Sequence, residues 1–174
     1  MKFAFTALLA AVAIVSVGCV TKPDNIVPVQ PFDSKLYLGK WYEIARLDQR
    51  FERGLSRVTA DYSMRPDGGL KVLNRGYDAE KKVYKESEGK AYFVGATDTA
   101  YLKVSFFGPF YGSYIVFDLD PAYRTSMVGG PDLSYLWILS RTPTIDAATR
   151  ARLLEKAKGL GYATEQLIFV DQSE

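Results

Sequence analysis

The sequence predicts an all-β protein: an eight-stranded antiparallel up-and-down barrel with one C-terminal α-helix packed outside it and a short final strand. Short alternating apolar stretches recur between turns rich in glycine, proline and aspartate. Only the stretch after residue 142 has convincing helical spacing over any length. A chain of 174 residues, 48% of them hydrophobic, can bury one substantial core and has little room for a second domain.

The N-terminus reads as a targeting segment that does not belong to the fold. Lys2 is followed by an apolar run over 3–17, which is shorter than the roughly 20 residues of a spanning helix, so we interpret 1–18 as a signal peptide. Shortly after this run comes Cys19, the only cysteine of the chain, and the sequence that leads to it is similar to the lipobox of bacterial lipoproteins. We expect Cys19 to be acylated, although ordinary signal peptidase could cut the same bond. Residues 19–31, with three prolines, are then a lipidated N-terminus and tether, and 32–174 the barrel domain.

The barrel is predicted from a regular series of strands. A helical turn over 32–38, capped by Asp33, comes first. Strands are expected over 41–47, 57–64, 70–77, 83–94, 100–106, 113–120, 123–128 and 135–141. Gly89 and Gly112 are candidate bulges, where the inward set of a strand would change. Eight antiparallel strands can close into a barrel that holds one small ligand.

One amphipathic helix and a short strand complete the chain. Thr144 is the expected helix cap, with Asp146 in the first turn. Apolar residues then follow at helical spacing until Gly159 and Gly161: Ala148, Ala151, Leu154 and Ala157. We expect this helix to pack on the outside of the barrel, followed by an edge strand over 167–170.

The composition restricts the chemistry that the chain can perform. There is no histidine, the commonest general base and metal ligand, and a single cysteine cannot form an internal disulfide or a cysteine–histidine pair. The net charge of +2 disfavours a nucleic-acid binder. We therefore expect no catalytic residue, no metal site, no cofactor and no nucleic-acid partner.

Four motifs carry a resemblance to a known family. Gly39-Lys40-Trp41 opens the first strand, 130–135 forms an aspartate-containing turn, Arg141 follows the eighth strand, and 106–112 is an aromatic turn. The chain resembles the lipocalin family, in particular its bacterial outer-membrane lipoproteins, which form a group with apolipoprotein D. The resemblance implies that Gly39, Trp41 and Arg141 close one end of the barrel. If both strands face inward, Arg141 can lie over the Trp41 ring.

The function implied by this resemblance is the binding and storage or transport of fatty acids or lysophospholipids for maintenance of the envelope. The implied location is the periplasmic face of the outer membrane, held by an acyl anchor. Two alternatives from other classes remain: a lipid-modifying enzyme that works without histidine, and an interaction module or homodimer that uses the 106–112 turn.

Strand alternation yields candidate ligand contacts, for each of which plain core packing is an equal alternative. The candidates are the residues expected to face inward: Ala45, Val58, Ala60, Tyr62, Leu70, Val72, Asn74, Leu102, Val104, Phe106, Ile115, Phe117, Met127, Tyr135 and Trp137. Arg50 and Arg53, on the first long connection, are head-group candidates. Glu43 is a third, and if it faces inward it needs a charged or hydroxyl partner or a raised pKa.

Overall fold

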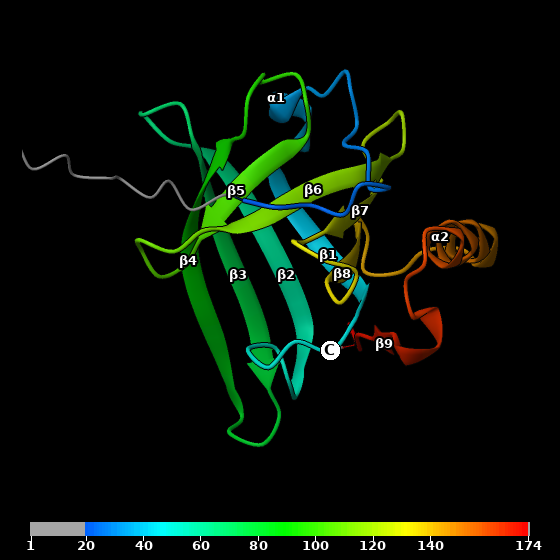
Figure 1. Cartoon of the computed structure of the whole chain (residues 1–174). Helices are drawn as coiled ribbons and strands as arrows, with labels where there is room; N and C mark the ends of the chain where they lie inside the picture. Colours follow the sequence, from blue (N-terminus) through cyan, green and yellow to red (C-terminus); the bar gives the residue numbers. More distant parts are fainter. Residues whose placement is uncertain (1–19, 174) are drawn as a thin grey trace, which may run out of the picture.

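The computed structural model describes residues 20–173, which form a closed antiparallel barrel with a helix beside it (Figure 1). The elements follow in the order α1 (Ser34–Tyr37), β1 (Gly39–Arg46), β2 (Leu55–Met64), β3 (Leu70–Asp78), β4 (Val83–Phe93), β5 (Tyr101–Ser105), β6 (Gly112–Leu119), β7 (Thr125–Gly129), β8 (Leu136–Ser140), α2 (Ala147–Gly159), the 3-10 helix η1 (Thr164–Gln166) and β9 (Ile168–Phe169). Each strand from β1 to β8 pairs with the next, and β8 pairs with β1, so the predicted fold class is confirmed.

The up-and-down order gives the barrel two different ends. Helix α1 and the connections β2–β3, β4–β5 and β6–β7 lie at one end, which we call the closed end. The connections β1–β2, β3–β4, β5–β6 and β7–β8 lie at the other, the open end. Asp33 caps α1 as predicted, since its carboxylate accepts a hydrogen bond from the Lys35 amide at 2.9 Å.

The seam of the barrel is completed by the C-terminus. β1 pairs with β2 only between Gly39 and Tyr42, and β9 pairs with β1 further along, at Ala45 and Arg46. Beyond β9, the Gln172 amide donates to two backbone carbonyls, Glu43 at 2.7 Å and Val58 at 3.0 Å. The C-terminal segment therefore fills the wedge where β1 and β2 diverge.

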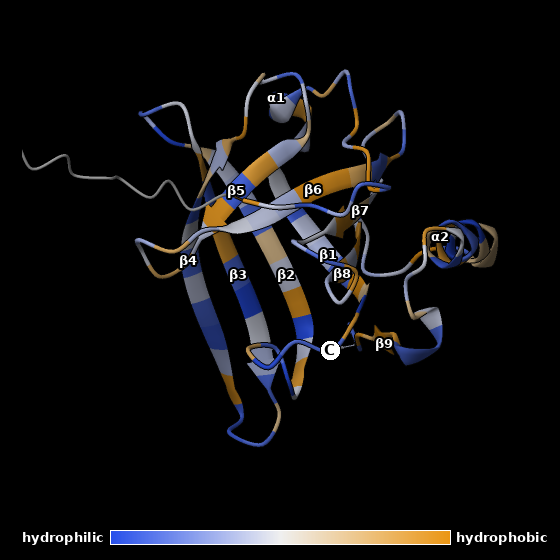
Figure 2. Cartoon of the chain, in the orientation of Figure 1, coloured by the Kyte–Doolittle hydropathy of each residue, from blue (hydrophilic) through white to orange (hydrophobic). Residues whose placement is uncertain are grey.

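Two hydrophobic clusters lie on opposite faces of the same strands. One fills the barrel, and the other lies between the barrel and α2, whose Leu153 and Ala157 are fully buried. Figure 2 shows hydrophobic residues on β6 and β8, while much of β4 is hydrophilic. The helix thus packs outside the barrel as predicted. Its cap is Asp146, which accepts from the Thr149 amide at 2.9 Å, so the expected cap at Thr144 is wrong.

Two local expectations are also corrected. The β3–β4 register runs without a break from Leu70 to Asp78, so Gly89 is not a bulge. A side chain on Gly89 would collide with Phe106, with a Cβ only 2.8 Å from that ring, so this glycine makes room for an aromatic residue.

The second correction concerns residues 20–31, which do not stand free as a tether. The Val29 amide donates to the Val116 carbonyl at 2.8 Å, and Ile26 is fully buried in the cluster under α2. Tyr101 donates to the Val20 carbonyl at 2.8 Å. The segment is an outer layer of the barrel. Within residues 20–173 we find no helix long and apolar enough to cross a membrane.

Candidate functional site

The closed end is sealed by Trp41 and Arg141. Trp41 is fully buried, and its indole N–H donates to the Tyr37 carbonyl at 2.9 Å. The Arg141 guanidinium carbon lies 3.9 Å from the centre of the Trp41 ring, which is the stacking that the sequence suggested. Arg141 also donates to the carbonyls of Lys40 at 2.8 Å and Leu36 at 2.9 Å. Gly39 has φ of +87°, a conformation that favours glycine at this turn into β1.

The interior next to this seal, the closed half of the barrel, is filled by aromatic side chains. The hydroxyls of Tyr37 and Tyr62 both lie within hydrogen-bonding distance of the Tyr114 hydroxyl, at 3.0 and 2.6 Å, and Tyr37 also reaches Ser126. A cavity of about 10 Å³ remains among these rings and their apolar neighbours. A volume of this size holds at most one water. An acyl chain cannot enter the closed half unless these rings move.

The other half of the interior, the open half, is accessible to solvent. Asn74, Val104, Phe106 and Trp137 face inward but are only half-buried. Ser87, which pairs with Asn74 and shares its face, is exposed. Inward residues that solvent can reach indicate that the barrel is hollow here, and the exposed rings and aliphatic groups form an apolar wall.

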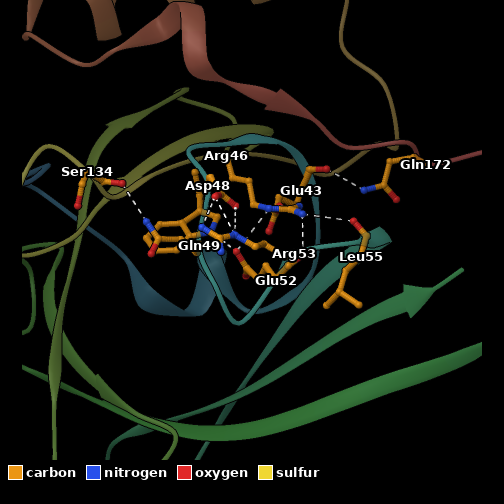
Figure 3. Close-up of polar contacts among 10 residues, drawn as sticks. Glu43, Arg46, Asp48, Gln49, Glu52, Arg53, Leu55, Ser134 and Gln172 are labelled. Atoms are coloured by element: carbon orange, nitrogen blue, oxygen red, sulfur yellow. Dashed lines mark hydrogen bonds and ion pairs between the residues drawn. The ribbon is translucent and has the colours of Figure 1, made fainter. Parts of the chain in front are cut away.

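The wall opposite β4 and β5 carries a buried ionic cluster, formed by Glu43, Arg46 and Glu52 (Figure 3). An Arg46 Nη1–Glu43 Oε1 contact of 2.6 Å and an Arg46 Nε–Glu52 Oε2 distance of 3.8 Å join the three. Arg46 also donates to the Glu52 carbonyl at 2.8 Å, and the Trp137 indole donates to the Glu52 carboxylate at 3.0 Å. All three charged groups are at most 6% exposed.

One positive charge in this cluster balances two carboxyl groups. Burial, followed by repulsion from Glu52, raises the pKa of Glu43 to about 8, although Arg46 acts in the opposite direction. Burial also raises the pKa of Glu52. Because Arg46 can balance only one carboxylate in a desolvated site, the pair holds one proton near neutral pH. The cluster is then close to neutral and can donate as well as accept hydrogen bonds.

The β1–β2 connection, residues 47–54, carries Glu52 over the barrel mouth. The buried Gln49 side chain donates to the Ser134 carbonyl on the β7–β8 connection at 2.9 Å. Together with the Glu52–Trp137 hydrogen bond, this contact holds the connection across one side of the opening. The mouth is thus bordered by two connections that are joined to each other.

The comparisons with known proteins identify the family. A family model described as a lipocalin-like domain matches residues 32–172. The chain belongs to the lipocalin family. Lipocalins bind small hydrophobic ligands, which agrees with a barrel that is sealed at one end and has solvent-accessible inward side chains at the other.

Several lipocalins are similar to this one over most of their length. The outer membrane lipoprotein Blc of Vibrio cholerae is 56% identical over 156 residues, covering 89% of this chain and 91% of that protein. The protein of the same name from Escherichia coli K12 is 53% identical and covers 95% and 94%. Temperature-induced lipocalin-1 of Arabidopsis thaliana is 36% identical, covering 88% and 87%. The structure of insecticyanin from Manduca sexta matches with a TM-score of 0.70 at 20% identity, covering 89% and 88% of the two chains, and shows the fold alone.

Most of the predicted lining residues do face into this lipocalin's barrel. Tyr62, Leu70, Val72 and Leu102 pack in the closed half with Ala60 beside them. The remaining inward residues lie in the open half or at its mouth: Val58, Asn74, Val104, Phe106, Tyr135 and Trp137. Only this second group lies outside the filled closed half.

Four predicted lining residues lie on the wrong side of the barrel wall. Ala45, Ile115, Phe117 and Met127 belong to the cluster beneath α2. Bulges cause part of the error, since the register shifts between Glu43 and Ala45 and between Val116 and Asp118. On β6 and β7 both faces are apolar, because α2 covers the outer one, so hydropathy alone could not show which face points inward.

The same bulge in β1 reveals two site residues that the sequence did not suggest. It turns Arg46 inward opposite Trp137, on the same side as Glu43. Glu52 enters from a connection, where alternation makes no prediction. The predicted inward position of Glu43 is correct, and its partner is Arg46.

The two arginine head-group candidates lie away from the barrel interior. Arg53 is exposed on the β1–β2 connection and pairs with Asp48 at 2.6 Å, and Arg50 is also exposed. The signal peptide and Cys19 fall outside the described residues, so their assignments stay predictions.

Proposed function

We propose that this lipocalin binds a single-chain amphiphile, a fatty acid or a lysophospholipid, in the open half of its barrel, and stores or carries it for maintenance of the cell envelope. The observation that carries the proposal is the set of inward, solvent-accessible apolar side chains of the open half, Val104, Phe106 and Trp137. The acyl chain packs against this wall, since burying apolar surface drives such binding.

The head group meets the ionic cluster, which lies beside Trp137 and across the interior from Val104 and Phe106. A guanidinium binds carboxylates and phosphates through paired donors, and Arg46 is held in place by two backbone carbonyls. Glu43, when protonated, supplies a further donor. Glu52 is on a connection rather than a strand, and it moves aside when a ligand oxygen replaces it. Arg50 and Arg53 then lie at the rim, where they attract anionic ligands.

Two relatives support a proposal for the cellular location of the protein. The similar proteins of Vibrio cholerae and Escherichia coli are named outer membrane lipoproteins. We place this chain at the periplasmic face of the outer membrane, anchored through acylated Cys19. Cells given labelled palmitate should incorporate it into the parent protein and not into Cys19→Ser, and labelling of the variant would contradict the assignment.

Lipid binding is tested by filling the open half. Asn74→Trp places a large ring on the inner face of β3, while Leu73→Trp, the matched control, places the same ring on the outer face. We expect Asn74→Trp to weaken binding of lysophosphatidylethanolamine and oleate by at least about tenfold, or 1.4 kcal/mol, with Leu73→Trp like the parent. Equal affinity in all three would overturn the site.

We also propose that the bound lipid is not chemically changed. The lipocalin family is a family of binding proteins, and the chain has no histidine to act as a general base. Incubation with lysophosphatidylethanolamine should return the intact lipid. Release of a free fatty acid by the purified protein would favour the lipid-modifying alternative.

A further inference from the structure

The β5–β6 connection at the open end presents two large apolar rings to solvent. Phe107 and Phe110 are each 79% exposed, the highest values among the large hydrophobic side chains of the described residues. The connection is shaped by a turn in which the Phe110 amide donates to the Phe107 carbonyl at 3.2 Å. Neither ring contributes to the two hydrophobic clusters. Two adjacent exposed rings at a loop tip indicate a surface that contacts another apolar phase.

Basic and aromatic residues surround this tip. Tyr111 follows Phe110, and the ammonium groups of Lys103 and Lys90 lie 5.1 and 6.0 Å from the centre of its ring. Neither lysine forms an ion pair within residues 20–173. Phenylalanine at the centre, tyrosine beside it and free lysines around it form the pattern of a segment that lies in the interface of an anionic bilayer.

The beginning of the described chain lies next to the same connection. The Thr21 carbonyl accepts a hydrogen bond from the Ser113 hydroxyl, three residues after Phe110, and the Val20 carbonyl accepts one from Tyr101 on β5. Figure 1 shows this first segment crossing β5 and β6. Val20 and Thr21 therefore lie beside the strands that flank the aromatic turn, so a membrane anchor at the adjacent Cys19 would bring the turn to the bilayer.

We propose that the 106–112 turn inserts Phe107 and Phe110 into an anionic lipid bilayer, with Lys90 and Lys103 contacting the head groups. Because the turn joins β5 and β6 at the open end, insertion brings the barrel mouth to the membrane surface. An amphiphile can then pass between bilayer and barrel without crossing bulk water. This transfer route rests on the proposed function, while membrane docking itself does not.

The test uses the chain from residue 19 onward with Cys19→Ser as the parent, so that neither an acyl chain nor the apolar run over 3–17 contributes. Binding is measured by flotation with vesicles of phosphatidylethanolamine and phosphatidylglycerol. Phe107→Ser with Phe110→Ser should weaken binding by about tenfold for each ring removed. The matched control is Leu36→Ser at the closed end, where an exposed apolar residue is also replaced, and it should bind like the parent. Lys90→Gln with Lys103→Gln should reduce binding only when phosphatidylglycerol is present.

Three results would overturn the proposal. The first is a parent that does not float with vesicles, and the second is a double phenylalanine variant that floats as well as the parent. The third is a dimer in size measurements that this variant converts to a monomer with no change in flotation. That result would assign the turn to contact with a second copy of the chain. Lysophospholipid binding by the same variants separates the two proposals. Loss of vesicle binding with lysophospholipid affinity retained supports docking, while absence of lysophospholipid binding in every variant rejects only the proposed function.

Discussion

At the scale of single residues, a proton shared by Glu43 and Glu52 sets the charge of the barrel interior. Arg46 balances one of the two carboxylates, and burial makes a second negative charge costly. The chain has no histidine, so no other side chain ordinarily titrates between pH 5 and 8. The pH dependence of this protein in that range therefore reports on the cluster.

The stability of the parent should fall as the pH rises from about 5 to about 8. In the folded state Glu43 keeps its proton up to a pKa of about 8, whereas in the unfolded chain it loses the proton near the ordinary value of 4.5. Between these two values a rise in pH therefore favours the unfolded state, and the free energy of unfolding falls. The slope should approach about 1.4 kcal/mol per pH unit, measured by urea unfolding at several pH values.

Two variants separate this effect from others. Glu43→Gln imitates the protonated acid and should flatten the slope. Asp48→Asn removes an exposed carboxylate whose hydrogen bond with Arg53 lowers its pKa, and it should leave the slope unchanged. A parent whose stability is constant or rises over this range would contradict the shared proton.

Arg141 acts at the same scale, and we expect it to stabilise the fold without touching the ligand. Arg141→Met removes the stacking on Trp41 and the charged hydrogen bonds to the Lys40 and Leu36 carbonyls. The free energy of unfolding should drop by about 2–3 kcal/mol, with lysophospholipid affinity unchanged. Arg150→Met removes an exposed stacking contact with Phe169 and should cost less than about 1 kcal/mol. A variant that keeps its stability but loses the ligand would place Arg141 in the binding site.

At the scale of elements, the sequence predicts the number, order and approximate limits of the strands, because turn residues and alternation are local properties. It does not predict which face of β6 points inward. Ile115 and Val116 are both fully buried, one under α2 and the other inside the barrel. The bulge in β1 is equally invisible, since nothing in Glu43-Ile44-Ala45 distinguishes it from a regular strand. Arg46 could be recognised only after the register was known.

The two faces of the wall should respond differently to truncation. Phe117→Ala removes a buried ring that stacks on Tyr162 at 5.6 Å, so it should cost about 3–5 kcal/mol of stability and leave lysophospholipid affinity unchanged. Phe106→Ala removes a half-buried ring of the open half, so it should weaken lysophospholipid binding and cost less stability than Phe117→Ala. Urea unfolding and calorimetric titration measure both. Equal losses of affinity would mean that the ligand does not occupy the open half.

At the scale of the whole molecule, the two halves of the barrel differ along its axis: the closed half is a packed core, and the open half is the proposed binding site. The closed half is filled by tyrosines and sealed by Arg141, while the open half keeps solvent-accessible apolar groups beside a buried ionic cluster. α2 and residues 20–31 cover part of the outer surface of the barrel. The mouth is bordered by the connections at the open end. The family motifs at the closed end therefore identify the fold, while in the proposed function the residues of the open half determine which ligand binds.

The central claim, that an amphiphile occupies the open half, is tested most directly by photolabelling. A fatty acid with a diazirine near the middle of its chain is bound to the parent protein and irradiated, and labelled residues are identified by mass spectrometry. We predict labels on Val104, Phe106 and Trp137, which face the open half. Labels on Ile115, Phe117 or Met127, beneath α2, or no saturable labelling at all, would contradict it.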